Sequence, residues 1–382
     1  MIAQIQRVIL HIKTTFKISI LLALLCPVIA HSYDTAADFA ILQDYNTGTV
    51  LYEKKADEKL YPSSMSKLMT LYVLYKQLEV GKIKLTDTLN ITENAWKTGG
   101  SKMFVQVGTQ VSIEDLINGI AVQSGNDACV AVAEGLAGNE PAFAEQMNKV
   151  AQQLGMSNSH FTNSSGLPDD NHYSTARDLL LLSARIIGDF PQYYPYLTKK
   201  EFSYNGITQG NRNLLLGIGG VDGLKTGHTE AGGYGIVISA ERNGQRLIGV
   251  INGLPSEIAR KKEAESLLNY GFGNFDYKML YKQGQVIADL PLTYGKSKKL
   301  AIIADKNIAV ILPKMHADPE VKLVYNAPLV APIKKDEKLA DLVVTSEGKV
   351  VLTRPLMAQA DIQEVSAFCR IIPNLKFYLF GG

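Results

Sequence analysis

The sequence predicts a mixed α/β fold in which helices flank an antiparallel sheet, followed by a small all-β domain and a C-terminal amphipathic helix. Two hairpin patterns, around Asn46-Thr47-Gly48 and around Asn243-Gly244, bracket a series of helical patterns, so both ends of the first domain are expected to build one sheet. From about residue 285 to residue 355, short Val/Ile/Leu runs alternate with Gly, Pro and charged turns, which is typical of a β domain. A chain of 382 residues has room for both domains.

Residues 1–30 are predicted to be a secretory signal. Basic residues precede an apolar run at 18–30, which ends in Val28-Ile29-Ala30, a small-residue pattern suited to cleavage after Ala30. A membrane-spanning helix or a core strand is the alternative, but the run is shorter than the ~20 residues that a span requires and follows positive charge. The mature chain is therefore expected to be secreted across the inner membrane.

The overall composition argues against several classes of function. The chain has 39 Lys and Arg against 37 Asp and Glu, so no basic field favours nucleic acid as a partner. Six scattered histidines show no HxxH or CxxC pairing, so neither a metal site nor a cofactor is expected. Only Cys129 and Cys369 remain after removal of the signal, and two thiols so far apart do not make a disulfide framework. Cys129 lies in a helical pattern and is expected to be a buried small residue.

The elements of the first domain follow in order. A hairpin at 38–54 opens the mature chain, and a helix is expected from Ser64 to about Gly81, because its periodicity begins after Pro62 and glycine stops it. The β pattern at 234–253 is expected to complete the sheet. Further helical patterns occur at 112–122, 126–138, 140–155, 175–188 and 256–272.

Domain boundaries follow from these patterns. The first domain is predicted to span 31–280, the small β domain 281–358 and the amphipathic helix 359–382. Pro373 and the polar residues of the last segment argue against a spanning helix, so this segment is expected to lie on the inner-membrane surface. The alternative is that it packs on the β domain. Its apolar face would consist of Val365, Phe368, Ile372, Leu375 and Leu379.

Ser64 and Lys67 are the candidate nucleophile and base. Three residues apart at a helix start, they share a face, so the amine can reach the hydroxyl. A serine hydroxyl is a weak nucleophile at neutral pH unless a neutral amine removes its proton, and burial or a second cation keeps a lysine neutral. A simple helix cap is the alternative. The same spacing recurs at Ser346 and Lys349, in a predicted hairpin turn where a solvated lysine is the plain explanation.

Two further groups of residues strengthen the prediction of a catalytic site. Ser124 and Asn126 place a hydroxyl and an amide at a break between two helical patterns, and Lys225-Thr226-Gly227 leads into the hairpin strands. A helix start, a helix junction and a strand can converge on one cleft. The twins of these two groups do not occur in those settings: Ser203-Tyr204-Asn205 and Lys97-Thr98-Gly99.

These motifs resemble those of the D-alanyl-D-alanine carboxypeptidases, the low-molecular-mass penicillin-binding proteins of bacterial cell walls, whose catalytic fold is that of the serine β-lactamases. The resemblance runs from about residue 36 to the C-terminus and rests also on the segments SGNDACVAVAE, HYSTARDL, EFSYNGITQGNRN, GLKTGHTEAGGYG and LLNYGF. It implies that 31–280 is the catalytic domain of an enzyme that removes the terminal D-alanine from peptidoglycan stem pentapeptides. β-Lactam antibiotics are then the expected inhibitors, and the periplasmic face of the inner membrane is the expected location.

The resemblance implies that three residues carry the reaction. Ser64 attacks the carbonyl between two D-alanines and forms an acyl-serine, and Lys67 accepts its proton. Ser124 helps to pass that proton to the leaving D-alanine. Lys225 raises the local positive potential and so keeps Lys67 neutral.

The remaining candidates are expected to bind the substrate. Backbone N–H groups of Ser64 and His228 form an oxyanion hole, and Asn126 and Gly227 contact the substrate. The free carboxylate of the substrate has three candidate partners: Thr226, Arg212 and Arg260.

Three of these assignments have plainer alternatives. In these alternatives, His228 contributes only its backbone and its packing, Arg260 lies on a solvated helix face, and Asn126 caps a helix. The segment that begins with Lys97 is expected to be a loop near the cleft.

The predicted function also has alternatives. A class A serine β-lactamase needs a glutamate to activate the deacylating water, and the region TNSSGLPDDNHYSTARDL has none. A D,D-endopeptidase of this fold would lack the second domain and the tail. A non-catalytic wall-binding protein would be expected to have lost one of the four motif residues Ser64, Lys67, Ser124 and Lys225. A carboxypeptidase is therefore the preferred prediction.

Overall fold

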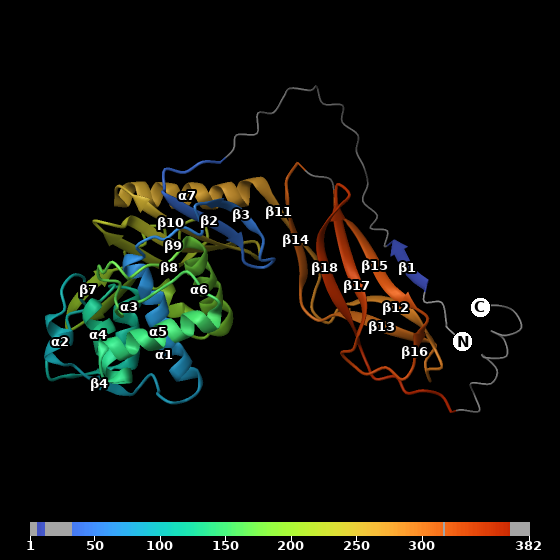
Figure 1. Ribbon diagram of the computed structural model, residues 1–382, viewed down its shortest axis with the longest axis horizontal. Coiled ribbons are helices and arrows are strands. Elements are labelled where there is room, and N and C mark those ends of the chain that lie inside the picture. Colours follow the sequence, from blue (N-terminus) through green and yellow to red (C-terminus); the bar gives the residue numbers. More distant parts are fainter. Residues whose placement is uncertain (1–5, 12–32, 316–317, 367–382) are drawn as a thin grey trace, which may run out of the picture. The chain divides into compact units, whose positions relative to one another are not determined.

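The structure is a computed structural model that describes residues 6–11, 33–315 and 318–366 (Figure 1). The chain forms two compact units, one of residues His31–Gly273 and the other of Asn274–Gly382 together with Met1–Ala30. Each unit has its own hydrophobic core. The division lies at the end of helix α7 (Glu257–Asn274), a few residues before the boundary expected at 280.

The helices predicted from periodicity are present in the larger unit. Several of them begin or end at capping residues, as in α5, where the Asn139 side chain accepts a hydrogen bond from the Ala142 N–H and Gly155 ends the helix with φ 84°. Two five-residue elements, α2 and η2, are too short for periodicity to predict. The elements are η1 (Ser63–Ser66), α1 (Lys67–Glu79), α2 (Glu93–Lys97), α3 (Ile113–Ala121), α4 (Asn126–Ala137), α5 (Glu140–Leu154), α6 (Ala176–Asp189), η2 (Tyr194–Thr198) and α7.

The main sheet of the larger unit has five antiparallel strands in the order β3-β2-β10-β9-β8. The predicted closure of the sheet from both ends of the domain is confirmed, because β10 pairs with β2 and Val250 lies opposite Ile41. The strands are β2 (Phe39–Asp44), β3 (Val50–Lys54), β8 (Val221–Thr229), β9 (Gly233–Arg242) and β10 (Gln245–Leu254). Two small hairpins lie outside this sheet: β4 (Thr88–Asn90) with β5 (Gln110–Ser112), and β6 (Glu201–Tyr204) with β7 (Ile207–Gly210).

Helices cover both faces of this sheet (Figure 1). Helix α7 lies on one face, where Leu267 packs over Gly249 of β10, and the other helices gather on the opposite face. Helix α1 is apolar around most of its circumference and is buried over most of its length, as expected for a helix at the centre of a domain. Lys67, the first residue of this helix, is buried, whereas Ser64, in the turn before it, is half-buried.

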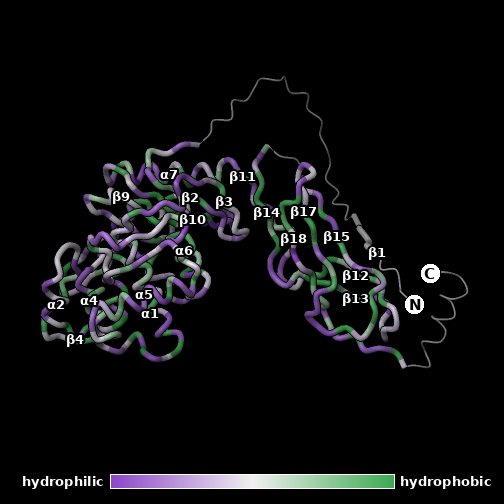
Figure 2. The backbone as a smooth tube through the Cα atoms, viewed as in Figure 1, coloured by the Kyte–Doolittle hydropathy of each residue, from purple (hydrophilic) through white to green (hydrophobic). Residues whose placement is uncertain are grey.

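The smaller unit is all β, as predicted. Figure 2 shows hydrophobic and hydrophilic residues interspersed along strands such as β15, in which every second residue from Val321 to Tyr325 is buried. The first strand of the unit after α7, β11, begins at Phe275, earlier than the domain start expected at 281, because this aromatic strand follows α7 directly, without a turn signal between them. The strands are β11 (Phe275–Tyr281), β12 (Val286–Thr293), β13 (Lys299–Ala304), β14 (Ile308–Pro313), β15 (Glu320–Ala327), β16 (Leu329–Val330), β17 (Lys338–Ser346) and β18 (Lys349–Ala358).

Seven strands of the smaller unit form one sheet in the order β1-β15-β17-β18-β13-β12-β16, and β11 pairs with β14. Strand β1 (Gln6–His11) comes from the predicted secretory signal and runs antiparallel to β15. The rest of that signal lies outside the described residues. Among the described residues, none of the helices has the length and the apolar content needed to cross a membrane.

The amphipathic helix predicted from residue 359 does not begin there. Residues 359 and 360 form a bend, after which Ile362 forms a β-bridge with Ile333, and Glu364 forms one with Gly295. The Ile362 side chain packs against the core of the smaller unit, and its N–H donates to the Ile333 carbonyl at 2.9 Å, which explains why this stretch adds to the β structure. The remaining part of the predicted helix, 367–382, lies outside the described residues.

Candidate active site

Ser64 lies in the 3₁₀ turn η1, and Lys67 is the first residue of α1. Lys67 Nζ lies 2.9 Å from Ser64 Oγ, as their three-residue spacing predicts. The neighbouring hydroxyls have other partners: Ser63 Oγ lies 3.0 Å from the hydroxyl of Thr229, and Ser66 Oγ lies 2.8 Å from His172 Nε2. Ser64 is therefore the serine of this turn that is paired with the amine.

Lys67 is completely buried, and its amine has three acceptors. Besides Ser64, it donates to Asn126 Oδ1 at 2.7 Å and to the Ser165 carbonyl at 2.6 Å. Burial lowers the pKa of Lys67 to about 8, and the charge of Arg212 acts in the same direction. A lysine with this pKa is partly neutral near neutral pH, so it can accept a proton from the Ser64 hydroxyl.

Lys225 was expected to keep Lys67 neutral, but the main cause of the lowered pKa of Lys67 is its own burial. Lys225 instead contacts Ser124. Lys225 Nζ donates to Ser124 Oγ at 3.0 Å and to the Thr226 carbonyl at 3.1 Å. Burial holds the pKa of Lys225 itself well below its ordinary value, and the charges of Lys67 and Arg212 add to this effect. The site thus contains two buried lysines, each hydrogen-bonded to one serine hydroxyl.

Ser124 lies in the turn between α3 and α4 and has a φ of 60°, which is uncommon for serine. Asn126, the first residue of α4, does not cap the helix with its side chain. Its Oδ1 accepts from Lys67, and its Nδ2 donates to the Gly99 carbonyl at 2.8 Å. The helix-cap alternative for Asn126 is therefore wrong.

A cavity of about 350 Å³ opens beside Ser64. Lys67, Asn126 and Lys225 do not line it but are buried next to it and joined to its wall by hydrogen bonds. The lining comes from segments far apart in the sequence, so only the folded chain brings it together. The lining residues are Ser64, Ser101, Ser124, Arg212, Thr226, Gly227, His228, Tyr234, Glu257 and Arg260.

Arg260 is only 5% exposed, so the alternative of a solvated helix face is wrong. Its Nη2 donates to Glu257 Oε1 at 2.6 Å and to the Arg212 carbonyl at 3.1 Å. Its guanidinium also lies over the ring of Tyr234, with Cζ 5.7 Å from the ring centroid. Arg212 and Arg260 therefore place two guanidiniums in one cavity, an arrangement suited to a carboxylate ligand.

Strand β8 forms one wall of the cavity. It contains Lys225-Thr226-Gly227 within its length rather than before it, which corrects the expectation that this motif leads into a strand. A side chain at Gly227 would lie 2.8 Å from the Pro62 carbonyl oxygen, so glycine allows β8 to approach the turn that carries Ser64. The His228 ring stacks on Tyr234, with ring centroids 3.9 Å apart, and this side chain therefore has a packing role.

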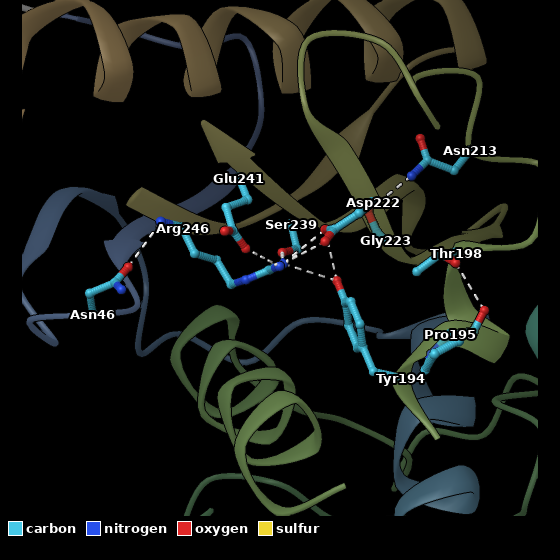
Figure 3. A network of polar contacts seen from close by, with 10 residues as sticks. All are labelled: Asn46, Tyr194, Pro195, Thr198, Asn213, Asp222, Gly223, Ser239, Glu241 and Arg246. Atoms are coloured by element: carbon cyan, nitrogen blue, oxygen red, sulfur yellow. Dashed lines mark hydrogen bonds and ion pairs between the residues drawn. The ribbon is translucent and has the colours of Figure 1, made fainter. Parts of the chain in front are cut away.

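A polar network holds the first residues of β8 in place (Figure 3). The Tyr194 hydroxyl donates to Asp222 Oδ1 at 2.8 Å. Asn213, next to Arg212, donates from Nδ2 to the Gly223 carbonyl at 3.0 Å and so ties the Arg212 segment to the same strand. The guanidinium of Arg246 donates hydrogen bonds to four side chains: Tyr194, Asp222, Ser239 and Glu241.

Several residues of the site were not predicted. The Ser165 carbonyl contacts Lys67, and Glu257 and Tyr234 line the cavity, yet no role was predicted for these three residues. The one local signal is Gly166, which has a φ of 80° and whose added side chain would lie 1.8 Å from the Ser63 carbonyl oxygen. A glycine is required there because the two loops pass so close to each other.

The twin motifs lie outside the cavity lining. Ser346 pairs with Lys349 across the β17–β18 turn, as predicted, and Ser203 lies in the small hairpin of β6 and β7. Lys97 forms an ion pair with Glu93 on α2. The segment that follows Lys97 does approach the cavity, as the resemblance implies, because the Gly99 carbonyl binds Asn126 and Ser101 lines the wall. Cys129 is fully buried, as expected.

Comparison with known proteins agrees with this geometry. A family model described as D-alanyl-D-alanine carboxypeptidase matches residues 27–255, and one described as penicillin-binding protein 5, C-terminal domain, matches residues 275–364. The D-alanyl-D-alanine carboxypeptidase DacA of Haemophilus influenzae is 40% identical over 340 residues, which cover 87% of this chain and 86% of that protein. DacA of Escherichia coli is 39% identical over 350 residues, covering 89% and 87%.

A solved structure of penicillin binding protein 5 from Haemophilus influenzae superposes with a TM-score of 0.81 at 38% identity, covering 88% of this chain and all of that one. Penicillin binding protein 6B from Escherichia coli superposes with a TM-score of 0.71 at 32% identity, covering 87% and 98%. One family model matches the larger unit and the other matches the smaller unit, and the DacA relative covers 87% of the chain. The chain belongs to the D-alanyl-D-alanine carboxypeptidase family.

Proposed function

We propose that this chain removes the terminal D-alanine from peptidoglycan stem pentapeptides through an acyl-enzyme at Ser64. The family and the names of its relatives support the reaction type. The observation that carries the proposal is the distance of 2.9 Å between the buried Lys67 amine and the Ser64 hydroxyl, in a cavity that also contains two guanidiniums.

In the first half of the reaction, neutral Lys67 accepts the hydroxyl proton of Ser64, whose oxygen bonds to the carbonyl carbon between the two D-alanines. The charge that develops on the carbonyl oxygen is stabilised by backbone N–H groups of Ser64 and His228. The carbon–nitrogen bond then breaks, and Ser124 passes the proton to the departing amine. The products of this half are free D-alanine and an ester on Ser64.

The two guanidiniums hold the free carboxylate of the substrate. Arg212 and Arg260 line the cavity together with Thr226, and a planar anion can accept several hydrogen bonds from guanidinium groups. This contact places the last peptide bond next to Ser64 and selects peptides with a free C-terminus.

In the second half, water attacks the ester carbon and gives a proton to Lys67. The bond to Ser64 Oγ breaks, the serine regains a proton, and the shortened peptide leaves. A β-lactam offers the same kind of carbonyl, so penicillins acylate Ser64 as well. Slow attack of water on that ester then leaves the enzyme inhibited.

Labelling with a fluorescent penicillin tests the site, and release of D-alanine tests the reaction. The purified chain should be labelled on Ser64, as peptide mapping by mass spectrometry shows, and should release D-alanine from an acylated peptide that ends in D-alanyl-D-alanine. Labelling without release would identify a penicillin-binding protein that does not turn over this substrate. Rapid hydrolysis of penicillin would instead identify a β-lactamase.

We infer that the mature chain acts at the periplasmic face of the inner membrane. The signal pattern of residues 1–30 and the apolar spacing of Phe368, Ile372, Leu375 and Leu379 in the sequence support this inference. The test compares the full mature chain with a chain ending at Ser366, which retains the bridges of Ile362 and Glu364 to the smaller unit. Only the full chain should sediment with membranes of gently lysed cells. Recovery of both chains in the soluble fraction would contradict the inference.

A further inference from the structure

We propose that Glu257 is a specificity-determining residue, which competes with the terminal carboxylate of the substrate for the guanidinium of Arg260. The proposal rests on the function proposed above, because it concerns the same cavity. Glu257 would then determine how tightly the enzyme holds a free C-terminus, and how readily it releases D-alanine.

The charges that line the cavity are the first observation. Arg212 and Arg260 supply two positive charges, and Glu257 is the one acidic residue among the described residues of the lining. A site that binds a carboxylate is expected to be purely basic, because an acid repels the ligand. The presence of Glu257 in this wall therefore requires an explanation.

The contact between Glu257 and Arg260 is the second observation. Glu257 stands in the first turn of α7, three residues before Arg260, so both side chains lie on one face of the helix. Glu257 Oε1 accepts a hydrogen bond of 2.6 Å from Arg260 Nη2. The arginine is thus engaged by an internal carboxylate before any substrate arrives.

The burial of the two partners differs, and this makes the contact exchangeable. The Arg260 side chain is 6% exposed and cannot leave the wall, whereas the Glu257 side chain is 49% exposed and can turn to solvent. Burial lowers the pKa of Arg260, while the charge of Glu257 acts in the opposite direction. In the free enzyme, Glu257 therefore balances the positive charge of buried Arg260. When substrate binds, its terminal carboxylate can replace Glu257 in this contact.

The competition affects binding more than chemistry. The terminal carboxylate is present in the substrate, in the transition state and in the D-alanine product alike, so an interaction with it contributes to all three. Removing a competitor should therefore lower KM and strengthen product binding, while kcat changes little. This pattern differs from that of a residue that merely orients Arg260, whose loss would raise KM.

The test compares Glu257→Gln with a matched control, Glu265→Gln, which removes the same charge from an exposed position of the same helix outside the cavity lining. In Glu257→Gln, KM for a peptide ending in D-alanyl-D-alanine should fall about threefold, as expected for a partly exposed ion pair, with kcat nearly unchanged. The control should match the wild type in both constants.

A second measurement does not require turnover. N-acetyl-D-alanine and its C-terminal amide are added as competitors of fluorescent penicillin labelling. Glu257→Gln should bind the free acid about threefold more tightly than the wild type does and the amide equally well. Weaker binding of the acid, or no change in either ligand, would overturn the role of Glu257. Absence of D-alanine release by the wild type would overturn the proposed function instead, and the competition measurement would still decide this inference.

Discussion

The amine of Lys225 donates a hydrogen bond of 3.0 Å to the hydroxyl of Ser124, although the two residues are 101 positions apart in the sequence. Lys67 makes the same kind of contact with Ser64, but these two residues are only three positions apart at the start of one helix. Both amines are buried, and burial lowers both pKa values. In the mechanism proposed above, the proton passes from the nucleophile to the leaving amine by way of these two serine–lysine pairs.

Replacement of Ser64 by alanine is expected to abolish penicillin labelling and D-alanine release, with a loss of at least about a thousandfold, because the covalent step has no other hydroxyl paired with Lys67. The matched control is Ser346→Ala, which changes the same motif in the β17–β18 turn and should keep full activity. Labelling rates and D-alanine release are measured in parallel. Covalent label on Ser63, Ser66 or Ser346 of the wild type would contradict this assignment.

Lys67→Arg should lower the acylation rate about a hundredfold or more, because a guanidinium stays protonated at any working pH and cannot accept the serine proton. Circular dichroism should show a folded chain, so that the loss can be attributed to chemistry. Stopped-flow labelling with the fluorescent penicillin gives the rate. If the arginine variant kept most of the wild-type rate, Lys67 would contribute charge alone and another group would be the base.

The acylation rate should rise with pH in the range around 8. Burial lowers the pKa of Lys67 to about 8, and the neutral amine is the form that accepts a proton, so the active fraction grows as the pH passes through this value. His172 contributes no titration in this range, because burial lowers its pKa to about 4. Second-order labelling rates between pH 6 and pH 10 check the profile. A rate that falls over this range would show that the active form of Lys67 is protonated.

Lys225→Ala should reduce the acylation rate by about a hundredfold, whereas Lys97→Ala should change it by less than about twofold. Lys225 contacts Ser124 in the interior, and Lys97 pairs with Glu93 on the surface of α2. Both variants are compared under the same labelling assay after a check of thermal unfolding. Equal losses in two folded variants would mean that the β8 motif has no special role.

Much of the fold could be predicted because it depends on local patterns. Hairpin turns at Asn46-Thr47-Gly48 and Asn243-Gly244 and the apolar periodicity of α1 are properties of short segments, and the structure contains each of these elements. The segment after residue 358 was not predicted correctly, because its conformation depends on a distant partner. Ile362 pairs with Ile333 of the smaller unit, and the periodicity of the segment itself does not show this partner.

The contact between Ser64 and Lys67 could be predicted from the chain alone, because a spacing of three residues at a helix start leaves little freedom. Three other features depend on the folding of distant segments: the Ser165 carbonyl accepts a hydrogen bond from Lys67, Lys225 contacts Ser124, and Arg260 is buried beside Glu257. The cost of burying a polar group, and its pKa, depend on which distant segments exclude water from it and which hydrogen-bond partners those segments supply. The spacing of residues along the chain does not show which distant segments will bury them.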